Sequence, residues 1–152
     1  MVPALRAILV GCDSDRFQRT LDLLFAAGLL VATFAAYAVG LFQVTGGVII
    51  LPEDATLVGF VAAAGVGFRR GGLFIAWTLP FAAYLGFRAD WAVLGLSSQS
   101  LGGKLAFFFD PVGLAILAVA AIGIGTLGFA VGYLVQWCFG VLRQDRTAGD
   151  EH

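Results

Sequence analysis

Charged side chains are scarce in this sequence. They make up 12% of the 152 residues, whereas hydrophobic residues make up 60% and the mean hydropathy is +0.94. A soluble domain carries about 25% charged residues. The few charges also cluster in short groups between long apolar segments, which is typical of a chain that crosses a membrane several times. The net charge is −1 and no basic patch alternates with aromatic residues, so no nucleic-acid partner is expected.

Histidine and cysteine are nearly absent. The one histidine, His152, lies in a polar tail, so no histidine can activate a serine or cysteine nucleophile, and no HExxH motif occurs. Cys12 and Cys138 both fall on the side predicted to be cytoplasmic, where thiols stay reduced, and two cysteines alone cannot form a zinc site. We therefore expect no enzymatic activity, no cofactor and no metal.

Long apolar segments dominate what is present. The expected spans cover residues 21–42, 52–68, 73–87 and 111–142. A helix of about 20 residues crosses a hydrocarbon core about 30 Å thick, so the first span is long enough, the second is just long enough, the third is short and the last is long enough to protrude. The predicted fold class is an all-α integral membrane protein. Residues 1–152 form a single transmembrane domain, a four-transmembrane-helix bundle with short loops and one longer outer loop. The sequence leaves open whether residues 44–51 and 91–109 re-enter the membrane.

Two of these spans begin with the same local pattern, a proline beside acidic residues. Pro52 precedes Glu53 and Asp54, and Asp110 precedes Pro111. Proline is favoured in the first helical turn, and acidic side chains stabilise the positive end of a helix dipole. The pattern predicts a helix start near Pro52 and an aspartate cap at Asp110.

The distribution of lysine and arginine predicts the orientation in the membrane. With the N-terminus inside, seven arginines fall on the cytoplasmic side and only Arg88 and Lys104 fall outside. Positive residues favour the cytoplasmic side. We therefore place the chain in the cell membrane, with residues 1–15 and 143–152 as cytoplasmic ends and with Arg69, Arg70 and Arg143 as topology anchors.

Small residues recur along one face of the last span. Gly128 and Gly132 form a GxxxG motif, and Ala121 and Gly125 extend the pattern by one more pair. Small residues at this spacing allow two helix backbones to approach closely in a membrane. The partner helix belongs either to the same bundle or to a second subunit, and the motif does not distinguish the two.

Four acidic residues fall on the predicted outer side: Glu53, Asp54, Asp90 and Asp110. Carboxylate oxygens are ligands for hard cations, so one interpretation is a surface cation site. The other is that three of them have local roles, either beside a helix start or beside Arg88. Their spacing matches no calcium-binding loop.

Arginine outnumbers lysine eight to one, and the loops hold most of the ten acidic residues. In this composition the chain is similar to small multi-pass membrane proteins of haloarchaea, many of them uncharacterised. The resemblance implies no activity. The function expected from the residues is that of a structural or accessory membrane protein that acts through helix–helix contacts, as a homo-oligomer or in a larger membrane complex. The alternative is a channel or transporter subunit for a small solute, functional as an oligomer.

Overall fold

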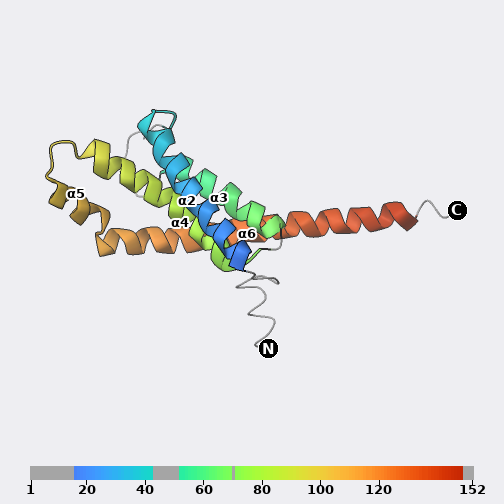
Figure 1. Ribbon diagram of the computed structural model, residues 1–152. Helices are drawn as coiled ribbons and strands as arrows, with labels where there is room; N and C mark the ends of the chain where they lie inside the picture. Colours follow the sequence, from blue (N-terminus) through green and yellow to red (C-terminus); the bar gives the residue numbers. More distant parts are fainter. Residues whose placement is uncertain (1–15, 43–51, 70, 149–152) are drawn as a thin grey trace.

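The computed structural model describes residues 16–42, 52–69 and 71–148, with side chains for 20–42, 52–69 and 71–140. All regular structure in these residues is helical, which confirms the all-α class. The elements are α2 (Arg16–Ala38), α3 (Glu53–Phe68), α4 (Leu73–Asp90), the π-helix η1 (Trp91–Gly95), α5 (Leu101–Phe108) and α6 (Pro111–Ala148) (Figure 1). Residues 44–51, where the sequence left re-entry open, lie outside the described residues.

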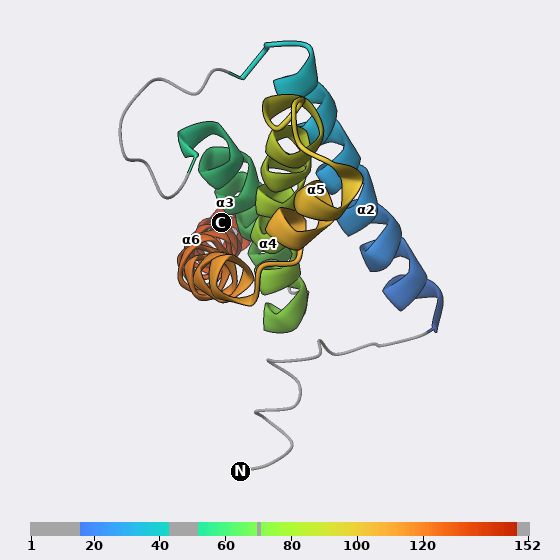
Figure 2. The ribbon, with the colours of Figure 1, turned by 90° about the vertical axis from the view of Figure 1, so that its left-hand side faces the viewer.

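The helices α2, α3 and α6 pack around α4. This helix contacts α2, α3 and α6, and α3 packs in addition along α6. α2 lies on the other flank of α4 from α3 (Figure 2). The chain direction alternates along the sequence, so α2 and α4 run one way and α3 and α6 the other (Figure 1). One end of the bundle therefore collects the ends of α2 and α4, the starts of α3 and α6, and η1 and α5. We call this the α5 end.

Most residues buried inside the bundle are small, and Tyr84 and Leu79 are the largest fully buried side chains. α3 buries Ala55, Gly59, Ala63 and Gly67, one residue in every four, so its buried face has almost no side chains. A Cβ atom added at Gly59 would lie 2.6 Å from the Cα atom of Pro80 on α4. Since real Cβ atoms are never so close to a neighbouring backbone, glycine at this position allows α3 and α4 to touch directly.

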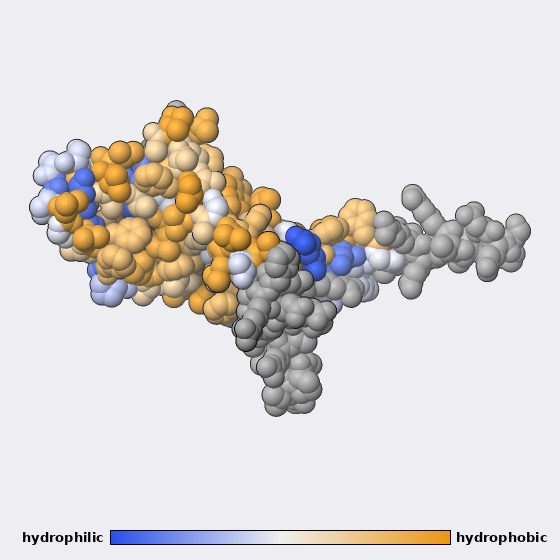
Figure 3. Space-filling view, in the orientation of Figure 1, coloured by the Kyte–Doolittle hydropathy of each residue, from blue (hydrophilic) through white to orange (hydrophobic). Residues whose placement is uncertain are grey.

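Large apolar side chains point away from the bundle, so that much of the surface is hydrophobic (Figure 3). They come from all four long helices and include Leu23, Phe25 and Val31 on α2, Leu57 and Val61 on α3, Phe74 on α4, and Val119, Leu127 and Leu134 on α6. The distribution is the reverse of a soluble protein, in which the large apolar side chains form the core.

Two stretches are long and apolar enough to cross a membrane, Thr20–Ala38 and Leu101–Gly140. Four spans are predicted from the sequence, so the other two need separate support. α3 has 16 residues, or about 24 Å of helix, which is shorter than the hydrocarbon core. α4 has 18 residues but carries Arg88 and Asp90 in its last turn.

Candidate functional site

Polar side chains gather at the α5 end, on two opposite flanks of the last turn of α4. Arg88 and Asp90 are two residues apart on this helix, and their side chains therefore point about 160° away from one another. The Arg88 flank faces α5 and α6. The Asp90 flank carries Gly86 one turn earlier, and Gly86 packs against Leu30 and Thr33 of α2.

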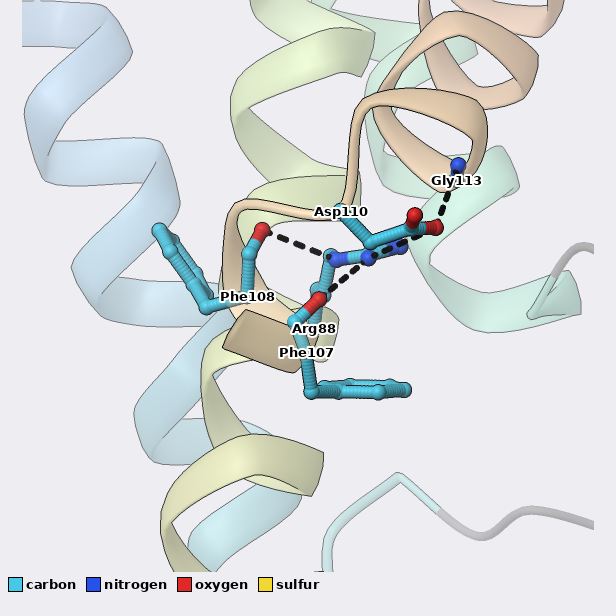
Figure 4. A network of polar contacts seen from close by, with 5 residues as sticks. All are labelled: Arg88, Phe107, Phe108, Asp110 and Gly113. Atoms are coloured by element: carbon cyan, nitrogen blue, oxygen red, sulfur yellow. Dashed lines mark hydrogen bonds and ion pairs between the residues drawn. The ribbon is translucent and has the colours of Figure 1, made fainter. Parts of the chain in front are cut away.

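Arg88 joins the ends of two helices (Figure 4). Its side chain is largely buried, and it donates to the main-chain oxygens of Phe107 and Phe108 at the C-terminal end of α5, with 3.1 Å from Nε to the oxygen of Phe108. The guanidinium also lies 4.8 Å from the centre of the Phe107 ring and 3.7 Å from a carboxylate oxygen of Asp110. A cation stabilises the negative end of a helix, so Arg88 caps α5.

Asp110 completes this network by capping α6. Its carboxylate accepts a hydrogen bond from the amide of Gly113 at 2.7 Å, which is the cap that the sequence predicts. A Cβ atom on Gly113 would collide with the Arg88 guanidinium, so glycine is needed where the arginine crosses the first turn of α6. The network fixes the position of α5 and α6 on α4.

The position of Arg88 corrects an expectation from the sequence. Arg88 was expected at the membrane interface with Asp90 as its neighbour, but the structure buries it and pairs it with Asp110. The reason is tertiary. The carbonyl groups that accept its hydrogen bonds lie about twenty residues further along the chain and approach only because α5 folds back over the end of α4. The outer segment 91–109, expected as a loop, contains η1 and α5.

The other flank of α4 holds polar atoms that lack partners. Thr33 and Tyr37 lie one turn apart on α2, are 2% and 8% exposed, and face α4. The Tyr37 ring packs edge-on against Phe87 with 5.0 Å between centroids. Within the described part of the chain, the Thr33 Oγ1 atom has no hydrogen-bond partner. The Tyr37 hydroxyl interacts with the backbone of Ala55 in the first turn of α3. Unpaired buried hydroxyls are rare because burial removes their bonds to water.

Asp90 lies at the same level of the bundle. One of its carboxylate oxygens, Oδ1, is buried and lacks a hydrogen-bond partner in the described residues. Asp90 and Asp54 are both close enough to the Tyr37 hydroxyl to interact with it electrostatically. Directly after Asp90 the chain continues as the π-helix η1, a helical form that is found mainly at functional sites.

Another polar contact joins α3 to α4, between Thr56 and Tyr84. The Thr56 Oγ1 atom lies 3.0 Å from the hydroxyl of Tyr84, which is fully buried, and Thr56 also donates to the carbonyl of Pro52 at 2.8 Å. This pair has its hydrogen bonds, in contrast to the Thr33 Oγ1 atom. It fastens the first turn of α3 to the centre of the bundle.

The structure separates the four acidic residues that the sequence grouped. All four lie at the α5 end, but Asp110 belongs to the Arg88 network and Glu53 is exposed at the start of α3. Only Asp54 and Asp90 are brought toward a common group, Tyr37. Sequence analysis missed Thr33, Tyr37 and Arg88 as members of the site. The spacing of Thr33 and Tyr37 by one helical turn was the signal that could have found the first two.

The small residues of α6 lie inside the chain's own bundle. Ala121, Gly125, Gly128 and Gly132 are buried, and the last three contact backbone atoms of α3 or α4. A Cβ atom on Gly128 would lie 2.7 Å from the carbonyl oxygen of Phe60, and one on Gly132 would collide with the carbonyl of Ala64. The matching face of α3, with its repeat of alanine and glycine, was missed although the same spacing is visible in the sequence.

Two of the three proposed topology anchors, Arg69 and Arg143, lie at the end of the bundle opposite α5 or beyond it. Arg69 is exposed and follows the last turn of α3, where its amide donates to the carbonyl of Gly65. Arg143 belongs to α6, whose C-terminal part extends past the other helices (Figure 1). Arg70 lies outside the described residues.

In the described part of the chain, no three His, Cys, Asp or Glu side chains come together in a way that could hold a metal ion. The chemistry at the α5 end is therefore that of single carboxylates, hydroxyls and one buried guanidinium. Comparisons of the chain with protein-family models, with curated proteins and with solved structures find no match.

Proposed function

We propose that this chain is a multi-pass integral membrane protein in which α2, α3, α4 and α6 each cross the bilayer. The observation that carries the proposal is the distribution of side-chain size, with alanine and glycine inside the bundle and leucine, valine and phenylalanine on its surface. Such a surface would aggregate in water. In lipid it costs nothing to expose, and close backbone contact between small residues then holds the helices together.

Low burial of the two longest apolar stretches supports the same conclusion. Only 11% of the apolar window in Thr20–Ala38 is buried within the fold, and 22% of the window in Leu101–Gly140. A helix from the core of a soluble protein would be mostly buried. A signal sequence that is later removed would not pack on the rest of the fold, whereas the backbone of α2 lies directly against Gly86 of α4.

The contacts of the short helices α3 and α4 support placing them in the membrane as well. α3 lies along α6 and α4 and exposes Leu57 and Val61 on its remaining face. Its ends carry Glu53, Asp54 and Arg69, which can reach the two interfaces from a helix of about 24 Å. α4 packs against both α2 and α6, the two helices that are long and apolar enough to span, and α3 packs along α6, so both short helices belong in the same bilayer.

The orientation proposed is the one that the arginine distribution favours, with both termini cytoplasmic and the α5 end outside. The test is cysteine labelling in intact cells, on a background in which Cys12 and Cys138 are replaced by serine. Ser98→Cys, at an exposed position, should react with a membrane-impermeant thiol reagent from outside, and Arg69→Cys, also exposed, only after the membrane is permeabilised. Release of the protein by alkaline carbonate, or labelling of position 69 from outside, contradicts the proposal.

The role proposed within the membrane is structural or accessory. No catalytic constellation is visible in the sequence, and the small-residue face of α6 is occupied by α3 and α4, so contacts to partners would use the outward-facing surfaces. Native mass spectrometry after purification in mild detergent should show the chain in a complex, either with copies of itself or with another membrane protein. A strictly monomeric protein argues against this role.

A transport subunit is the second candidate, and one observation favours it. Thr33 and Asp90 place buried polar atoms that lack hydrogen-bond partners among the described residues between α2 and α4. Polar and ionisable side chains that face the interior of a membrane bundle usually mark pathways for ions or solutes. The discriminating measurement is flux through proteoliposomes that contain the purified protein, compared with liposomes that contain the Asp90→Asn variant. Identical flux in both, at the level of empty liposomes, removes this candidate.

A further inference from the structure

α5 is a short helix that has no buried residue. It covers Leu101–Phe108 and contains two glycines. A helix of this length is marginal in water by itself. Here both of its ends are held, because the Ser100 hydroxyl accepts a hydrogen bond from the amide of Gly103 at 3.4 Å and Arg88 binds the carbonyls of the last turn. These bonds fix where α5 lies and leave its sides free.

The Arg88 bonds hold α5 at the level where the helices of the bundle end. Arg88 belongs to the last turn of α4, and Asp110, which pairs with it at 3.7 Å, directly precedes α6. α5 therefore lies across the end of α4 (Figure 2), level with the charged residues that end the proposed spans. In a bilayer this level is the boundary between the headgroups and the acyl chains, where interfacial helices lie.

The faces of α5 differ in their exposure. Lys104 and Phe108 are one turn apart, are partly buried and face the bundle. One flank carries Leu101, Leu105 and, directly after the helix, Phe109, at intervals of four residues. These three side chains are 80%, 57% and 64% exposed. A row of large apolar side chains with this exposure marks a contact with another apolar surface.

The charge on α5 favours phospholipid as the partner of this flank. α5 contains no acidic residue, and its one charged side chain, Lys104, folds back so that the amine donates to the carbonyl of Val93 in η1 at 3.0 Å. An apolar face with a basic residue beside it is typical of helices in a membrane interface, where anionic lipid phosphates attract the cation. Trp91 in η1 is 44% exposed, and tryptophan is enriched at the same depth.

We propose that α5 is an interfacial helix that inserts the flank of Leu101, Leu105 and Phe109 into the phospholipid leaflet at the α5 end of the bundle. Its eight residues make about 12 Å of helix, which is too short to cross the hydrocarbon core, so α5 enters one leaflet only. The inference rests on the proposed function, because it requires the bundle to cross a bilayer. It adds a contact with lipid outside the four spans.

The test measures the depth of single positions in the full-length protein, reconstituted in phosphatidylcholine vesicles. On a background in which both native cysteines are replaced by serine, one cysteine is introduced at a time, at positions that are all exposed: Leu101→Cys, Leu105→Cys, Ser98→Cys and Leu127→Cys. Each cysteine is labelled with a nitroxide. EPR power saturation then compares collisions with oxygen, which concentrates in lipid, and collisions with a nickel chelate, which stays in water.

We expect the ratio of oxygen to nickel collisions at positions 101 and 105 to be several times higher than at position 98, in the turn before α5. It should be lower than at position 127, in the middle of α6. Ratios at 101 and 105 equal to that at 98, with 127 in lipid, would mean that the flank stands in water. This result would overturn the inference and leave the proposed spans intact.

Two further outcomes separate the possible failures. Low access of both reagents to positions 101 and 105 would mean that protein covers the flank, either a second copy or another chain, and would overturn the inference as well. Free access of the nickel chelate to position 127 would contradict the proposed function, and the inference with it.

A second measurement covers the case in which the nitroxide disturbs α5. Leu105→Trp is made in a variant whose three native tryptophans are replaced by phenylalanine, and its fluorescence is measured in vesicles of brominated phosphatidylcholine. Bromine near the start of the acyl chains should quench the fluorescence more strongly than bromine near their ends. Absence of quenching by either lipid would overturn the proposal.

Discussion

At the scale of single residues, Arg88 connects more of the structure than any other charged side chain described. It caps the C-terminal end of α5, stacks on Phe107 and pairs with the aspartate that caps α6. Burial of a cation is costly unless its donors are used, and here two carbonyls and a carboxylate accept them. Asp110 is 47% exposed, so solvent screens the ion pair and the carbonyl contacts matter more.

We predict that Arg88→Met lowers the free energy of unfolding by about 2 kcal/mol, because it removes charged hydrogen bonds to the end of α5. Arg88→Lys should restore only part of this, since an ammonium cannot bridge the two carbonyls and the carboxylate as a planar guanidinium does. Denaturant unfolding in detergent measures the difference. Asp110→Asn is the companion variant and should cost less, because asparagine still caps α6. Equal stability of Arg88→Met and wild type would contradict the buried position of the arginine.

At the scale of helices, packing depends on faces without side chains. The alanine and glycine face of α3 meets Gly128 and Gly132 of α6, and Gly59 meets Pro80 of α4. Each contact brings one helix backbone against another, and van der Waals attraction then acts over the whole length of the pair. Specificity in the bundle comes from where the side chains are missing.

We predict that Gly132→Leu lowers the free energy of unfolding by about 1–3 kcal/mol or more, the range for an overpacked core, because the new side chain would push α6 away from Ala64 of α3. Gly123→Leu is a matched control on the same helix, since a Cβ atom there meets nothing within 4 Å. It should be neutral or slightly stabilising, given the higher helix propensity of leucine. Thermal unfolding of the two purified variants gives the comparison. If both lose the same stability, the effect is not one of helix contact.

At the scale of the whole molecule, the proposed membrane helices differ greatly in length, although all of them would cross a bilayer of one thickness. α3 has 16 residues and α6 has 38, which correspond to about 24 and 57 Å. A long helix adapts by tilting or by extending into water, but a short one requires the bilayer to become thinner. Because α3 packs along both α4 and α6, a bilayer that mismatches α3 strains the entire bundle.

We therefore predict that the reconstituted protein is more stable in thin bilayers than in thick ones. Phosphatidylcholines with monounsaturated chains of 14 to 22 carbons provide the series, and thermal unfolding in proteoliposomes is the measurement. The penalty is a fraction of a kcal/mol per Å of mismatch, so the unfolding temperature should decline steadily with chain length. A rise with chain length would mean that α3 does not set the thickness, and that it does not cross the membrane as proposed.

What the sequence determined by itself is local. Scarce charge and long apolar segments were enough to predict an all-helical chain, and the Asp110–Pro111 pattern predicted the cap of α6, because helix formation and capping depend on residues within a few positions of one another. The GxxxG motif marked a close contact but not its partner. The tertiary structure decided that α3 fills this groove, that Arg88 is buried against α5 and pairs with Asp110, and that Tyr37 packs against Phe87 of α4. These contacts join residues from 20 to more than 60 positions apart, and which distant segments approach depends on how all four helices share the space around α4.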